Sequence, residues 1–294
     1  MKSTIEFLKF RYIAYAVSAG LFIAFTTFTV MQGGINFGID FVGGVKIIAK
    51  FEKHVSETDL RKSLSGMNPL IQQIGEKDLN EFIISTKLAG DSTDDSKKSL
   101  EQIKTELNKN FKNIEFLSEE TVGPAIGNIL KRSAIKLFII SIILMTVYLA
   151  FRFEFKYSVG AMAALLHDIA ISVAFIGFAR VELNIPVVAA LLTIFGYSVN
   201  DTIVIFDRIR ENVQVKSKQT FTEVIDKSVN QSMSRTLLTS LTTLFSVAAL
   251  YFLGGEVLND FAKVLLFGIA VGTYSSIYIA SPILVAWEKL LIKK

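Results

Sequence analysis

Long apolar stretches separated by shorter polar segments dominate the pattern of hydrophobic and polar positions along this chain. A helix that crosses the hydrocarbon core of a bilayer, about 30 Å thick, needs about 20 predominantly apolar residues. Six stretches meet or approach that length: Tyr12–Met31, Ser133–Phe151, Ser158–Ala179, Pro186–Phe206, Met233–Leu253 and Val264–Trp287. The pattern therefore predicts six membrane-spanning helices.

The region between the first two apolar stretches, residues 33–131, has a different pattern. Short alternating runs predict strands, and Ser56, with Asp59 three residues later, is similar to a capping box at a helix start. The predicted strands are Val45–Phe51, Leu70–Ile74, Glu81–Thr86 and Ile114–Ser118, and the predicted helices are Ser56–Leu64 and Asp95–Phe111. The order β-α-β-β-α-β is that of a ferredoxin-like α+β domain. We therefore divide the chain into the N-terminus and first span (1–32), this domain (33–131) and spans two to six (132–294).

Composition supports a membrane protein and excludes several kinds of site. Of the 294 residues, 51% are hydrophobic, and the mean hydropathy is positive. The chain has no cysteine and only 2 histidines, which excludes disulfides and cysteine-ligated metals and leaves too few ligands for a histidine-rich site. The net charge of +4 does not indicate nucleic-acid binding, because the basic residues cluster beside the apolar stretches. We expect an integral membrane protein with no metal and no organic cofactor.

The basic residues also predict the orientation of the chain, because Lys and Arg accumulate on the cytoplasmic side of a membrane. The N-terminus carries Lys2, Lys9 and Arg11, and the segment 207–235 carries six basic residues. On the other side, residues 180–185 include one and residues 254–260 none. Both termini are therefore expected in the cytoplasm, and residues 33–131 outside. No small-residue cleavage motif follows the first span, which indicates an uncleaved signal-anchor.

One carboxylate lies inside a predicted span. Asp201 follows Asn200 in the fourth span, where an ionised group costs about 2.5–3.5 kcal/mol on a lenient insertion scale. Arg235, at the start of the fifth span, is the best candidate partner. At about 1.5 Å per residue, Asp201 lies about 7–8 Å and the Cα of Arg235 about 3 Å inside the cytoplasmic edge. We interpret Asp201, Asn200 and Arg235 as an ion-coupling site; the alternatives are a structural hydrogen bond for Asp201 and a snorkelling side chain for Arg235.

Other polar residues within the spans extend this candidate site. Hydroxyl residues of the fifth span follow Arg235 at helical spacing: Thr236, Thr239, Ser240 and Thr243. They either line a hydrated path or hydrogen-bond a neighbouring helix. In the third span, His167 and Asp168 are a second intramembrane polar pair. This pair is either part of a secondary polar path or a hydrogen-bonded contact between helices.

Small residues and a proline indicate helix packing and a helix start. Gly268, Gly272 and Ser276 recur at every fourth position of the sixth span, which allows close packing either within the chain or against a partner. Gly123 and Pro124 mark the return of the chain into the second span, where a proline can start a helix.

A glycine-rich segment, Gly33–Val45, opens the domain after the first span. Gly38, Gly43 and Gly44 flank Asp40 and predict a tight turn with an exposed backbone beside the membrane surface. A phosphate-binding loop is excluded, because no Lys-Ser or Lys-Thr pair follows and the next element is a strand rather than a helix.

Six segments, in order along the chain, resemble motifs of the SecF family. They are GIDFVGG after the first span, TVGPAIG before the second, LLHDI in the third, FGYSVNDTIVIFDRIREN in the fourth, SRTLLTSLTTLF in the fifth and GTYSSIYIASPI in the sixth. SecF is the smaller partner of SecD in the bacterial protein-export machinery and belongs to the resistance-nodulation-division superfamily. The motifs cover the membrane part almost end to end, and their combination is highly specific. The domain at residues 33–131 fits the family by its size and element order rather than by distinctive residues.

This resemblance implies a multi-pass subunit of the bacterial inner membrane. It implies partners as well: SecD, the SecYEG channel, the translocating preprotein and membrane lipids, but no nucleic acid. Such a subunit uses the proton-motive force to promote late-stage translocation and release of preproteins. The family's essential membrane carboxylate falls on Asp201 and its essential arginine on Arg235. We expect charged Asp201 to pair with Arg235, and protonation to loosen this pair and shift the helices.

Two other functions stay open, a half-subunit of a small-molecule exporter of the same superfamily and a non-transporting membrane scaffold. Such an exporter normally carries twice as many spans and two large external domains, and a scaffold gives no reason for a buried carboxylate. No hydrolytic constellation is visible, so we expect no enzymatic activity. The coupling ion is expected to be H⁺, with Na⁺ as the alternative, because a carboxylate with hydroxyl neighbours serves either ion.

Overall fold

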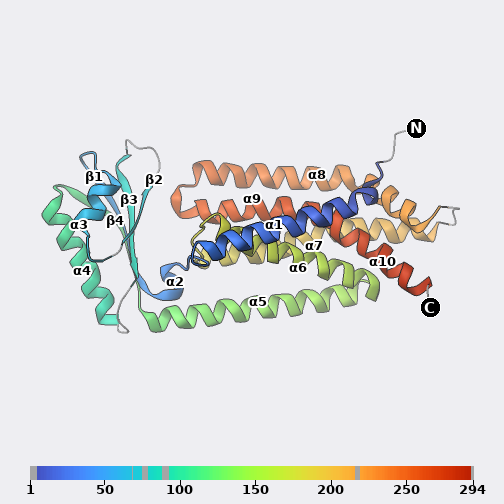
Figure 1. The fold of residues 1–294 in the computed structure, drawn as a ribbon, viewed down its shortest axis with the longest axis horizontal. Coiled ribbons are helices and arrows are strands. Elements are labelled where there is room, and N and C mark those ends of the chain that lie inside the picture. The colour runs from blue at the N-terminus through green and yellow to red at the C-terminus, as the bar shows by residue number, and fades with distance from the viewer. Residues whose placement is uncertain (1–4, 68, 75–78, 88–92, 216–218, 293–294) are drawn as a thin grey trace.

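Long helices lie side by side in a bundle that carries a small α+β domain at one end (Figure 1). This computed structural model describes residues 5–67, 69–74, 79–87, 93–215 and 219–292. Lys2, one of the basic residues behind the predicted orientation, lies outside the described residues.

Six helices in the described part of the chain are long and apolar enough to cross a membrane, which confirms the predicted number. The first five are α1 (Arg11–Met31), α5 (Pro124–Arg152), α6 (Phe155–Phe178), α7 (Ile185–Gln214) and α8 (Phe221–Leu253). The sixth consists of α9 (Glu256–Ser275), a π-helical turn η3 (Ser276–Ala280) and α10 (Ser281–Ile292). A short 3-10 helix, η1 (Phe7–Phe10), precedes α1. The π-helical turn was not predicted, because apolar periodicity does not distinguish it from an α-helix.

The helices extend beyond the apolar stretches into polar segments, and polar residues cap two of their N-terminal ends. At the start of α7, the Asn184 side chain accepts a hydrogen bond from the backbone N–H of Val187. At the start of α8, Thr220 and Glu223 form a capping box. Pro124 occupies the first position of α5, as predicted. Residue 131, one of the proposed domain limits, lies inside α5, which runs unbroken from Pro124 to Arg152. The proposed limits at residues 32 and 131 stay predictions.

The sheet domain, Gly44–Val122, has the predicted ferredoxin-like element order. Its elements are β1 (Gly44–Phe51), α3 (Glu57–Ser63), β2 (Leu70–Ile74), β3 (Glu81–Lys87), α4 (Thr93–Asn110) and β4 (Ile114–Val122). The strands pair antiparallel in the order β2-β3-β1-β4. Alternate residues of β1, Val45, Ile47 and Ala49, are fully buried in a cluster with Leu60 of α3 and with Ile103 and Leu107 of α4. Strand β4 continues four residues beyond the predicted end at Ser118 because Thr121 and Val122 still pair with β1.

Within the bundle, α6, α7 and the last span are the most buried, whereas α1, α5 and α8 are largely exposed. The small-residue stripe of the sixth span packs within the chain. A Cβ on Gly268 would lie 2.1 Å from Cδ1 of Ile194, and one on Gly272 would lie 3.1 Å from Cβ of Ser198, so α9 lies closely against α7.

The glycine-rich segment after α1 is not the exposed turn that the sequence predicts. Gly38, Gly43 and Gly44 are buried, and Asp40 belongs to a short helix, α2 (Ile39–Val42), between them. Gly43 has a φ of +79°, and a Cβ there would lie 2.9 Å from Cα of Pro124. The prediction of an exposed backbone was wrong because the glycines allow close approach to other backbone segments, a tertiary contact that the local sequence does not specify.

Candidate ion-coupling site

Asp201 lies inside the bundle on α7 and contacts two neighbouring helices. Only 2% of its surface is exposed. Its Oδ2 accepts hydrogen bonds from Ser240 Oγ of α8, at 3.3 Å, and from Thr273 Oγ1 of α9, at 3.5 Å. These two hydroxyls are also hydrogen-bonded to each other, at 2.7 Å. A carboxylate that is removed from water needs such donors, since an unpaired buried charge is costly.

Arg235 does not form the direct ion pair with Asp201 that the sequence analysis predicts. It is exposed on α8, and none of the ion pairs in the described part of the chain includes it. Its guanidinium is still close enough for an electrostatic interaction with the Asp201 carboxylate. The hydroxyls of Ser240 and Thr273 take the place of the expected partner, because Ser240 lies on the buried side of α8, whereas Arg235 lies on its exposed side.

Asn200 lies away from this site, although it precedes Asp201 in the sequence. Its side chain is exposed and lines a groove of about 520 Å³ between α7 and α5, with Gly196 and Tyr148 among the other lining residues. Neighbouring residues of an α-helix point in directions about 100° apart, so Asp201 and Asn200 lie on different faces of α7.

The hydroxyl residues of α8 divide between two environments. Ser240 and Thr236 are buried, but only Ser240 reaches Asp201, whereas the Thr236 Oγ1 is buried with no hydrogen-bond partner. Thr239 and Thr243 are half-buried and donate to backbone carbonyls of their own helix. Tyr197 of α7 also donates to Thr243. Of the predicted stripe, one residue is therefore part of the site.

Asp168 forms a second buried polar cluster on α6. It is 0% exposed, its Oδ1 lies 2.8 Å from Nδ1 of His167, and its Oδ2 accepts hydrogen bonds from Ser198 Oγ of α7, at 2.5 Å, and Ser275 Oγ of α9, at 2.6 Å. Nε2 of His167 is buried with no hydrogen-bond partner. Asp168 thus joins three helices, which agrees with the alternative of a hydrogen-bonded contact between helices.

A short segment of the last span connects the two carboxylates. Thr273 contacts Asp201 and Ser275 contacts Asp168, while Ser276 is hydrogen-bonded to Thr202 of α7, at 2.8 Å. The π-helical turn begins at Ser276, directly after these contacts. Such turns are frequent at functional sites, where they alter the direction of side chains along a helix.

The sequence analysis missed the hydroxyl residues that contact the carboxylates from α7 and α9. They are Ser198, Thr273 and Ser275, and Thr202, which contacts Ser276 rather than a carboxylate, was also missed. Two signals could have found them: Ser198 and Thr202 flank Asp201 on one helix, and Thr273 and Ser275 follow directly after the packing residue Gly272. Ser276, predicted only as a packing residue, is part of the same network.

The six apolar helices and the sheet domain give the chain the fold of one half of a resistance-nodulation-division-type membrane protein. Residues 102–290 match the family described as Protein export membrane protein SecD/SecF, C-terminal, and residues 32–54 match the SecD/SecF GG Motif. The chain belongs to the SecD/SecF family of protein export membrane proteins.

Relatives of this chain occur as separate subunits and as fused proteins. Protein translocase subunit SecF of Desulfurispirillum indicum is 38% identical over 296 residues, which cover 98% of this chain and 93% of that protein. Protein translocase subunit SecDF of Thermus thermophilus is 39% identical over 95% of this chain, but only 38% of that protein is covered. A crystal structure of SecDF from Thermus thermophilus matches 98% of this chain with a TM-score of 0.84 and 36% identity. This chain covers 39% of the length of the crystallised SecDF chain.

Proposed function

We propose that this chain is a SecF-type subunit that acts with SecD and uses the proton-motive force to promote late-stage translocation and release of preproteins through SecYEG. The observation that carries the proposal is Asp201, a carboxylate buried inside the bundle and held by hydroxyls from two neighbouring helices. The names of the relatives support protein export rather than small-molecule export or a scaffold. The subunit acts as part of a transporter and carries out no enzymatic reaction.

The proton acts by changing which contacts Asp201 makes. The charged carboxylate accepts hydrogen bonds from Ser240 and Thr273 and attracts the nearby Arg235 guanidinium. On protonation the attraction to Arg235 is lost, so α8 is held less strongly against α7. A ligand shifts a conformational equilibrium only by its differential affinity for the two states, and this loss of charge supplies the difference.

The fused SecDF relative supports SecD as the partner, because the chain covers only part of that protein and the rest is supplied there by the same polypeptide. Both termini are cytoplasmic in this proposal, and the sheet domain faces outward, where it contacts the emerging preprotein. The exposed apolar residues of α1 and α5 contact membrane lipids or the partner.

Export from membrane vesicles that contain this chain, SecD and SecYEG tests the proposal. We expect Asp201→Asn to lower proton-driven export by about tenfold or more, because Asn keeps the hydrogen bonds but cannot change its charge. Asp207→Asn is the matched control, since Asp207 lies on the same helix but outside the site, where its half-exposed side chain forms an ion pair with Arg152. Export by Asp201→Asn at the native level, with normal insertion and SecD binding, would contradict the proposal. Collapsing the proton and sodium gradients separately identifies the coupling ion.

A further inference from the structure

The segment after α1 lies along the loop between α6 and α7. The backbone N–H of Gly38 donates to the Leu183 carbonyl, and the N–H of Leu183 donates to the Asn36 carbonyl, both at 2.8 Å. Phe37 and Leu183 form a parallel bridge between these hydrogen bonds. A Cβ on Gly38 would lie 3.1–3.2 Å from atoms of Glu182 and Leu183, so only glycine allows this close contact without displacement.

Asp40 connects this segment directly to the start of α7. Its Oδ2 accepts a hydrogen bond from the backbone N–H of Ile185, the first residue of α7, at 2.9 Å. The N-terminus of a helix carries a partial positive charge and free N–H groups, so a carboxylate there is held by both hydrogen bonding and charge. Asn184 caps the same helix by accepting a hydrogen bond from Val187 N–H, so Asp40 is a second capping residue, supplied by another segment of the chain.

The sheet domain follows Asp40 closely in both sequence and space. Strand β1 begins at Gly44, and its neighbour β4 leads through Gly123 into Pro124 of α5. The two connections contact each other: a Cβ on Gly43 would lie 2.9 Å from Pro124 Cα, and one on Gly127 would lie 3.0 Å from Gly43 N. The helix α2, which carries Asp40, is therefore packed where the chain enters β1 and where it leaves β4 for α5.

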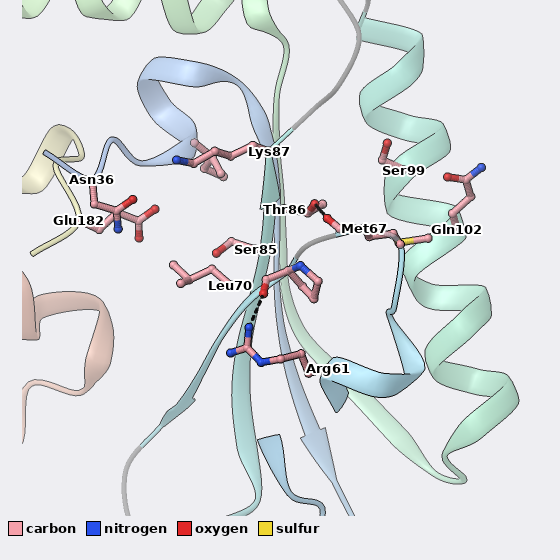
Figure 2. Close-up of a pocket in the computed structure, with 13 residues that line it drawn as sticks. Asn36, Arg61, Met67, Leu70, Ser85, Thr86, Lys87, Ser99, Gln102 and Glu182 are labelled. Atoms are coloured by element: carbon pink, nitrogen blue, oxygen red, sulfur yellow. Dashed lines mark hydrogen bonds between the residues drawn. The ribbon is translucent and has the colours of Figure 1, made fainter. Parts of the chain in front are cut away.

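A cavity of about 700 Å³ lies beside this junction (Figure 2). Asn36 and Glu182 line it from the bundle, and Ser85 and Lys87 of β3 line it from the sheet domain. The cavity leaves open space between the bundle and the sheet domain on this side of α2.

We propose that Asp40 is the coupling residue through which a movement of α7 reaches the sheet domain. Asp201 lies 16 residues after Ile185 on α7, about 24 Å along the helix axis, so the two contacts are at distant points of one continuous helix. A shift of α7 on protonation of Asp201 displaces the N–H group that Asp40 holds, and α2 carries this displacement to β1. The inference rests on the proposed function of Asp201.

Pairs of spin labels in the full chain, reconstituted with SecD in liposomes, test this coupling. The chain has no native cysteine, so Lys53→Cys, Val215→Cys and Phe155→Cys give selective labels at exposed positions. The Lys53 and Phe155 pair reports the position of the sheet domain relative to α6, and the Phe155 and Val215 pair reports the position of α7 relative to α6. In the native background we expect both distances to shift between about pH 5 and about pH 8.

With Asp40→Ala, the shift of the first pair should be lost and that of the second retained. Asp40→Asn keeps an acceptor for Ile185 N–H and should retain part of the first shift. The matched control is Asp59→Ala, since Asp59 also lies at a helix N-terminus but in α3, away from the junction. Insertion and SecD binding of each variant confirm that it folds.

Three outcomes would overturn the inference: no pH-dependent shift in the native background, a full shift of both pairs in Asp40→Ala, or loss of both shifts in Asp40→Ala. The last result would mean that Asp40 only stabilises α7. The proposed function fails in a different way, by retention of both shifts in Asp201→Asn.

Discussion

The carboxylates inside the bundle are held by hydroxyl groups rather than by cations. Asp168 has three polar contacts, whereas Asp201 has two longer ones and an electrostatic interaction with Arg235. The sequence alone could identify Asp201, because a charge inside an apolar run is costly wherever it lies. It could not identify Thr273, which is 72 positions away and meets Asp201 only through the packing of α9 on α7.

Substitution of Gly268 tests how closely α9 packs against α7. A Cβ at this position would lie 2.1 Å from Ile194 Cδ1 and 2.5 Å from Ile194 Cγ1, and Ile194 is itself buried. We expect Gly268→Ala to lower the free energy of unfolding by about 1–3 kcal/mol through overpacking. Titration of the purified protein with a denaturing detergent measures this change.

Gly20 of α1 is the matched control, because a Cβ there would meet no atom within 4 Å. Gly20→Ala should leave stability unchanged or raise it by about 0.5–1 kcal/mol, since alanine loses less conformational freedom in a helix. Equal effects of the two substitutions would show that α9 and α7 are not packed as described.

At the scale of elements, periodicity and turn signals predicted the spans and the sheet domain well. The strand Leu70–Ile74 has the predicted limits, and Ser56 caps α3 by accepting a hydrogen bond from Asp59 N–H. The helix ends and the π-helical turn were less predictable. A capping box starts α8 well before its apolar stretch, α7 continues past its stretch to Gln214, and Ser276 at the start of the π-helical turn contacts α7 in a way that no local pattern encodes.

The loop between α6 and α7 contains a carboxyl group whose ionisation is linked to stability. Burial raises the pKa of Glu182 above its ordinary value, the nearby Asp260 and Asp40 raise it further, and Lys46 and Lys87 oppose the change. The folded protein therefore holds this proton more tightly than the unfolded chain does. Its contribution to stability is complete below the unfolded pKa, about 4.3, and is lost as the pH rises through the folded pKa.

Glu182→Gln removes this linkage, because glutamine stays neutral. We expect the native protein to lose stability relative to Glu182→Gln as the pH rises from about 4 towards neutrality. Thermal unfolding of both proteins across this range measures the difference. Glu101→Gln on the exposed side of α4 is the control and should follow the native curve. A constant difference between native and Glu182→Gln at every pH would show that the ionisation of Glu182 is not linked to folding.

At the scale of the whole molecule, the sequence predicted the parts better than their contacts. Six spans and a ferredoxin-like domain follow from local pattern and order, and the structure agrees with both. The attachment of residues Asn36–Asp40 to the loop 180–185 did not follow, because these segments are about 145 positions apart and their contacts are mostly between backbone groups. The sequence shows such contacts only indirectly, as glycines whose role is close approach.

The orientation that the basic residues predict for the whole chain can be tested by labelling, because the chain has no cysteine. Lys62→Cys places a thiol on the exposed surface of α3, and Val215→Cys places one at the exposed end of α7. If Lys and Arg hold their segments in the cytoplasm, a membrane-impermeant maleimide should label Lys62→Cys in spheroplasts and leave Val215→Cys unlabelled. Both thiols should react after permeabilisation, which controls for accessibility. Labelling of Val215→Cys in intact spheroplasts would contradict the predicted orientation, and with it the outward position of the sheet domain on which the proposed contact with the emerging preprotein depends.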